Sequence, residues 1–104
     1  MKTAKTNAQQ GDVVLRKVIT AAGKVVSRGR CVLAEGEATG HAHIVDDEEA
    51  ELLRDGERIL LRLTRAATVV HEEHKPIRLS PGVWEIGRVQ EYDYFSRMAR
   101  PVAD

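Results

Sequence analysis

The sequence contains few of the features that mark a secreted or membrane protein. It has one cysteine, Cys31, so an internal disulfide is excluded. No apolar run approaches the roughly 20 residues that a membrane-spanning helix needs. The lysines near the N-terminus are not followed by the apolar stretch of a secretory signal. We therefore expect a soluble cytoplasmic protein that makes no membrane contact, in which Cys31 is a small buried hydrophobic residue.

The chain also has no excess of charge of either sign. Sixteen basic residues balance sixteen acidic ones. Without an overall positive field, the protein does not gather nucleic acid or anionic membrane surfaces from a distance. A polyanionic partner would therefore need a local basic patch, and we expect most charged side chains to form solvated surface ion pairs.

The sequence has no window with the period of a convincing amphipathic helix. Short β-rich runs alternate with turn residues instead, which predicts strands. These runs are residues 13–19, 25–26, 31–34, 41–45, 58–63, 68–70, 77–79 and 83–89. Residues 1–10 are polar and aperiodic, which predicts a flexible arm before a single β-rich domain over residues 11–104. We predict an all-β fold, a small antiparallel β-barrel or sandwich with at most one short helix.

Residues 46–54 are the nearest candidate for that helix, because acidic residues lead and Arg54 closes the segment as a helix dipole favours. The competing structure is a hairpin. Asp55-Gly56 lies between two apolar runs, and this dipeptide favours the tight turn that joins antiparallel strands. The hairpin is the preferred prediction.

All four histidines fall in two short motifs, GHAH at residues 40–43 and HEEH at residues 71–74. Imidazole is the commonest metal ligand and titrates near neutral pH, so two such motifs suggest one convergent site. If the first motif is extended, His41 and His43 project from the same face of a strand. Glu37 lies upstream in the same phase and is a candidate third ligand or general base.

The second motif is expected at the end of a strand. Lys75-Pro76 favours a break, because proline restricts the residue before it and cannot donate to a ladder. Residues 68–70 would then be a strand ending at His71, followed by a loop over residues 72–75. In that loop His74 would complete the ligand set, and a carboxylate would orient a ring or activate water.

We therefore predict a metal-binding β-barrel with a site for a divalent transition metal such as zinc, iron or manganese. The predicted ligands are the four histidines, His41, His43, His71 and His74. A metal-dependent hydrolase or lyase is one function of such a site, because a bound ion lowers the pKa of water and a carboxylate takes the proton. The candidate catalytic carboxylates are Glu37, Glu72 and Glu73.

Two other functions fit the same residues. In a non-catalytic interaction or accessory module, the histidines would stabilise loops and residues 92–100, which hold aromatic residues and arginines, would contact a partner. In a nucleic-acid-processing protein, metal-free histidines would act as acid and base while Arg58, Arg62 and Arg78 hold phosphates. A chain of this size has little room for a deep pocket, so we also expect a homodimer.

His41-x-His43 followed after four residues by Glu48 resembles the first metal motif of cupins, a β-barrel family in which two histidines and a glutamate bind a divalent ion. The resemblance implies a barrel and makes Glu48 a further ligand. The second cupin motif places a histidine after a Pro-x-Gly turn, whereas here His71 and His74 precede Pro81-Gly82. The likeness supports a β-barrel metal site by analogy and does not extend to membership.

Overall fold

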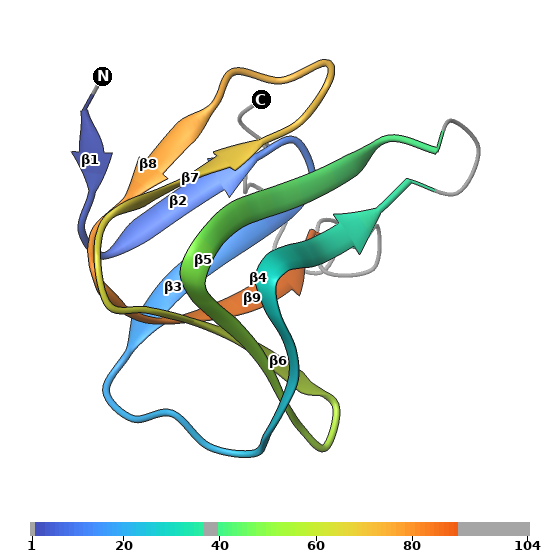
Figure 1. The fold of residues 1–104 in the computed structure, drawn as a ribbon. Helices are drawn as coiled ribbons and strands as arrows, with labels where there is room; N and C mark the ends of the chain where they lie inside the picture. Colours follow the sequence, from blue (N-terminus) through green and yellow to red (C-terminus); the bar gives the residue numbers. More distant parts are fainter. Residues whose placement is uncertain (1, 37–39, 90–104) are drawn as a thin grey trace, which may run out of the picture.

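The structure is a computed structural model that describes residues 2–36 and 40–89. These residues form one sheet of nine strands that curls into a nearly closed barrel (Figure 1). The strands are β1 (Thr3–Ala4), β2 (Asn7–Gln10), β3 (Val13–Val18), β4 (Lys24–Glu35), β5 (Ala42–Asp55), β6 (Arg58–Leu63), β7 (Ala67–Val70), β8 (Ile77–Leu79) and β9 (Gly82–Arg88). The prediction of a small all-β barrel is confirmed. Over the described ranges there is no helix capable of crossing a bilayer.

The predicted hairpin after residues 46–54 is present. Asp55 pairs with Arg58, which leaves Gly56 and Glu57 as the turn between β5 and β6. Gly56 has a φ of 63°, a left-handed conformation that glycine adopts without a Cβ clash. The segment proposed as an alternative helix therefore lies within β5.

Along β3 the buried side chains of Val13 and Leu15 alternate with the more exposed Val14 and Arg16, as expected of a strand with one face in the core. The largest fully buried side chain of the core is that of Trp84, the only tryptophan, which donates from Nε1 to the carbonyl oxygen of Ser80 at 3.0 Å. Cys31 is fully buried in the same core, as predicted. Burial, helped by the nearby carboxylates of Glu51 and Asp46, raises the pKa of the Cys31 thiol.

The two runs expected at residues 25–26 and 31–34 belong to one long strand, β4, which pairs with β5. Three register shifts interrupt this ladder. Bulges of this kind bend a strand and increase its twist, and β5 bends sharply across the barrel in Figure 1. As a result the first part of β5 pairs with β7, whereas its last part pairs with β6.

The N-terminal segment closes the barrel, which differs from the flexible arm expected over residues 1–10. β1 runs parallel to β8 at one edge of the sheet, and β2 runs antiparallel to β3 at the other edge. Between them the carbonyl oxygens of Ala4 and Thr6 accept hydrogen bonds from the backbone of Ser80 and Lys17. This short segment thus joins the two edges of the sheet, and we call their junction the seam of the barrel. The segment is mostly polar and has no apolar periodicity, so its sequence does not predict these strands.

Candidate functional site

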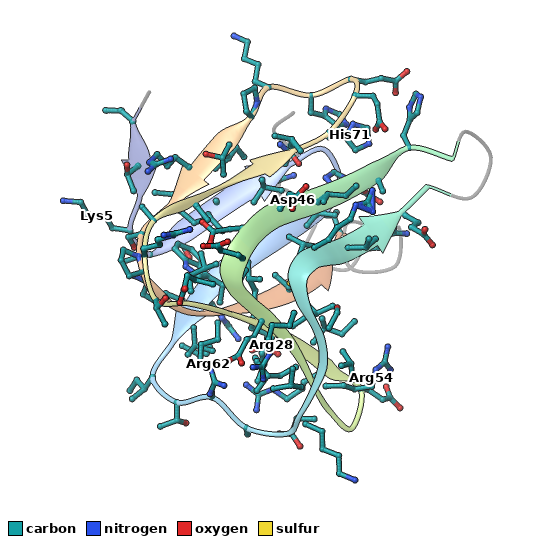
Figure 2. The ribbon with its side chains drawn as sticks, in the orientation of Figure 1. Lys5, Arg28, Asp46, Arg54, Arg62 and His71 are labelled. Carbon is teal, nitrogen blue, oxygen red and sulfur yellow. The ribbon has the colours of Figure 1, made fainter. Side chains whose placement is uncertain are left out.

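The two histidine motifs meet at one end of the barrel. β5 and β7 are antiparallel, with Ile44 opposite Val70, so the next position of the ladder places His43 opposite His71. The centroids of these two rings lie 4.3 Å apart. Figure 2 shows His71 at the end of the molecule opposite Arg54.

The other two histidines complete a cluster around His71. His41, which directly precedes β5, lies edge-on to His71 with ring centroids 5.7 Å apart. His74 lies 4.6 Å from His71 and is stacked on His43 at 5.9 Å. His71 therefore contacts each of the other three rings, and the two motifs form one site.

His43 is oriented by Gln10, the last residue of β2. Gln10 is itself only 1% exposed. The side-chain amide nitrogen of Gln10 donates to the carbonyl oxygens of Val69 at 3.1 Å and Lys75 at 2.8 Å. Carbonyl oxygens only accept, so the NH₂ group must face them and Oε1 must face His43. Oε1 lies 2.8 Å from Nδ1 of His43. Nδ1 therefore carries the ring proton, and the lone pair of the neutral ring is on Nε2.

His43 is also held in the neutral form. It is 3% exposed, and burial lowers its pKa to about 4, with His71 acting in the same direction. The carboxylate of Asp12, 3.8 Å from Nε2, opposes this shift without cancelling it. A neutral imidazole is the form that binds a metal, and His43 holds this form at neutral pH.

His71 holds its proton on the other nitrogen. The backbone N–H of Glu73 donates to Nδ1 of His71 at 3.0 Å, so the lone pair of the neutral ring is on Nδ1 and the proton is on Nε2. An ion bound at Nε2 would take the place of this proton. The hydrogen bond from the Glu73 N–H to Nδ1 of His71 would then break. By contrast, an ion bound at Nε2 of His43 would leave the hydrogen bond between Nδ1 of His43 and Gln10 in place.

Glu72 brings a carboxylate to the cluster. Its Oε1 accepts a hydrogen bond from the backbone of Ala42 at 3.3 Å. The backbone N–H groups of Glu72 itself and of Ala42 lower the pKa of this carboxyl. One ligand atom each from His41, His71 and Glu72 lie within 4.8 Å of one another. Ligands bound about 2.1 Å from a tetrahedral ion lie about 3.4 Å apart, so small side-chain rotations would bring these three into range.

The remaining carboxylate of the second motif lies at the rim. Glu73 is 3.5 Å from Nδ1 of His41, and its side chain is 63% exposed. A shallow hollow of about 250 Å³ borders the cluster, lined by residues of β5 and β7 and by the start of the loop after β7. These residues are Ala42, Ile44, Val70, His71 and Glu72. The lining thus combines three apolar side chains with an imidazole and a carboxylate.

Sequence reasoning missed the third wall of the site, residues 10–12, which are the end of β2 and the turn that leads into β3. Gly11 has a φ of 59°, and a Cβ there would lie 2.5 Å from Nε2 of His74. Asp12 faces His43, and its other oxygen lies 3.9 Å from Arg88. Gly11-Asp12 is recognisable in the sequence as a turn. Its contacts, His43 and His74, lie about 30 and 60 residues further along the chain, so no local pattern predicts them.

Several predicted residues are not brought to this cluster. Glu37 and residues 92–100 lie outside the described residues. Glu48, the ligand implied by the cupin resemblance, is exposed within β5 five residues beyond His43. The three arginines suggested for phosphate binding have partners on the protein surface. Arg58 pairs with Glu85 at 3.2 Å, Arg62 bonds Glu51 at 2.8 Å, and Arg78 donates to Thr68 at 3.2 Å.

Comparison with known proteins assigns the chain to a family. A family described as a domain of unknown function (DUF8820) matches residues 9–89. This range includes residues 10–12 and both histidine motifs. No curated protein and no solved structure matches the chain. Because the match covers most of the sequence, the chain belongs to the DUF8820 family.

Proposed function

We propose that the histidine cluster binds a divalent transition-metal ion such as zinc, iron or manganese. The observation that supports this most strongly is the convergence of ligand atoms from His41, His71 and Glu72 within 4.8 Å. Two imidazoles and one carboxylate are a ligand set used by catalytic zinc sites and by non-haem iron sites. His43 and His74 lie against His71 and are the additional ligands of the proposed site.

A metal-dependent hydrolase or lyase is the activity that this arrangement supports best. When bound, such an ion supplies the Lewis acidity that makes water a nucleophile near neutral pH. Glu73, exposed at the rim and 3.5 Å from His41, is placed to accept and release a proton. Glu37 remains a candidate for the same role. The hollow beside Glu72 would hold the apolar part of a small substrate.

The first test is the metal content of the purified protein, measured by elemental mass spectrometry after incubation with Zn²⁺, Mn²⁺ or Fe²⁺ and removal of free ions. We expect about one ion per chain in the wild type and loss of that ion in His71→Ala, because His71 contacts every other ring. Arg54→Ala, at the other end of the molecule (Figure 2), is the control that keeps its ion. A wild type that retains no ion under any of the three conditions would refute the proposal.

A metal-free structural role for the histidines is the second candidate, and the buried contact of His43 with Gln10 favours it. In that case His71→Ala lowers the stability of the protein, and added metal changes the stability of neither the wild type nor the variant. Thermal unfolding with Zn²⁺ and with EDTA distinguishes the two functions, because a ligand that binds only the folded state raises its stability.

A further inference from the structure

We infer that Gln10 is the positioning residue of the proposed metal site, and that through it ion binding is coupled to closure of the barrel by its N-terminal strands. The part of this inference that concerns ion affinity rests on the proposed function. The part that concerns the protonation pattern of His43 does not, because it follows from hydrogen bonds present without an ion.

Three successive residues, Gln10 at the end of β2 and Gly11-Asp12 in the turn that follows, each contact the histidine cluster. Gln10 accepts the Nδ1 proton of His43. Gly11 offers a surface without a side chain, on which the ring of His74 lies. Asp12 faces Nε2 of His43 at 3.8 Å. These residues are therefore one wall of the site, although β2 is an edge strand of the sheet and pairs with neither β5 nor β7, the strands next to the histidines.

Gln10 joins this wall to both histidine motifs. Its amide oxygen meets the first motif at His43, and its amide nitrogen meets Val69 on β7 and Lys75 directly after the second motif. All three bonds are made by one side chain that is almost completely buried. Removing it would leave the His43 Nδ1–H without its acceptor and two carbonyl oxygens without this donor, which is costly inside a protein.

The same amide also crosses the seam of the barrel. β2 and β7 are not paired with each other in the sheet order, so the bonds from Gln10 to Val69 and Lys75 link its two sides. An ion bound by His43 would stabilise the ring orientation that Gln10 requires. By thermodynamic linkage, ion binding then favours docking of β1 and β2, and docking of these strands raises ion affinity.

Two substitutions separate the roles of the amide. Gln10→Glu keeps an oxygen that accepts from His43 but removes both donors to the carbonyls. Gln10→Met has a similar shape and makes none of the three bonds. Leu61→Ala is the control for general destabilisation, because Leu61 is a buried core residue opposite Leu52, nine positions beyond His43 on β5.

The experiment measures the tautomer of His43 by long-range ¹H–¹⁵N NMR in EDTA, followed by titration with Zn²⁺. We expect the Nδ1–H tautomer in the wild type, in Gln10→Glu and in Leu61→Ala, and a mixture of tautomers in Gln10→Met. We expect Zn²⁺ affinity to fall 10- to 100-fold in Gln10→Met, as for other residues that orient metal ligands, and less than threefold in Leu61→Ala. Hydrogen exchange of the β1 and β2 amides should slow on adding Zn²⁺ to the wild type and to Leu61→Ala, but not on adding it to Gln10→Met.

The possible results separate the two proposals. A wild type that binds no Zn²⁺ refutes the metal site, and the tautomer of His43 in Gln10→Met still decides whether Gln10 positions the ring. If Gln10→Met keeps the Nδ1–H tautomer, the inference is overturned whether or not the protein binds metal. If the wild type binds Zn²⁺ and Gln10→Met binds it equally well, the coupling is overturned, whatever the stability of the variant.

Discussion

The ring of His74 lies directly on the backbone of Gly11, so that a methyl group added there would be 2.5 Å from Nε2 of the imidazole. This contact places a side chain of the second histidine motif against a turn some 60 residues earlier in the chain. Gly11 is needed for two reasons, since its φ of 59° is also unfavourable for residues with a Cβ.

Comparing Gly11→Ala with Gly56→Ala separates these two reasons. Gly56 has nearly the same φ, 63°, but a Cβ there meets nothing within 4 Å. We expect Gly56→Ala to lower the free energy of unfolding by about 1–2 kcal/mol, the cost of the left-handed backbone alone. Gly11→Ala should lose a further 1–3 kcal/mol, roughly that of an overpacked side chain. Urea denaturation measures both, and equal losses would show that the His74 contact contributes nothing.

The stability of the metal-free protein should fall as the pH is lowered from about 6.5 to 4. His43 has a pKa of about 4 in the folded protein, whereas an unfolded histidine titrates near 6.5. Between these values the unfolded chain binds the extra proton, so lowering the pH favours unfolding. The full difference corresponds to about 3 kcal/mol, present above pH 6.5 and lost at pH 4.

The control for this pH dependence is His43→Gln, which should be nearly flat from pH 6.5 to 5. The pKa values of Asp47, Glu51 and Glu85 are lowered chiefly by hydrogen bonds from arginines. Stability from those carboxylates is present above their ordinary pKa values near 4 and is lost only below them, so it does not explain a change above pH 5. A wild type as flat as the variant in EDTA would contradict the buried neutral state of His43.

Zinc should change the hydrogen bonding of His71 more than that of His43. In the metal-free protein His71 accepts from the backbone of Glu73 through Nδ1. Binding through Nε2 moves the proton to Nδ1, so the Glu73 amide loses its acceptor. We expect the Glu73 amide resonance to shift and its hydrogen exchange to accelerate on adding Zn²⁺. Unchanged Glu73 signals at saturation would show that Nε2 of His71 is not a ligand.

Cys31 should be unreactive in the folded protein and unnecessary for metal binding. It is fully buried in the core, and burial raises the pKa of its thiol, so both access and thiolate formation are suppressed. We expect a thiol reagent to label it only in denaturant. Cys31→Ala should keep the ion content of the wild type, and loss of the ion in a variant that stays folded would place Cys31 among the ligands.

The sequence predicted the strands that carry local signals. The alternation of Ile59, Leu61 and Leu63, with Asp55-Gly56 before them, is a short-range pattern that specifies its own hairpin. The bulged ladder between β4 and β5 has no comparable signal, because a register shift depends on the partner strand. The two apolar runs of β4 were therefore expected as separate strands.

The histidines of the site could be predicted, and their supporting residues could not. His41, His43, His71 and His74 are recognisable by residue type and spacing alone. Gln10 carries no such mark, because an amide in a polar segment usually faces solvent, and only its three partners explain its burial. The expected homodimer and the alternative function in nucleic-acid processing stay predictions.

The seam of the barrel also determines when the site can form. Thr3 pairs with Arg78, so this ladder joins residues 75 positions apart, whereas the β5–β6 hairpin closes over a few residues. Contacts between distant parts of a chain form slowly because a long loop must be ordered first. During synthesis, residues 10–12 therefore cannot contact the second histidine motif until that motif has left the ribosome. The site is complete only after β1 has paired with β8, which is synthesised late in the chain.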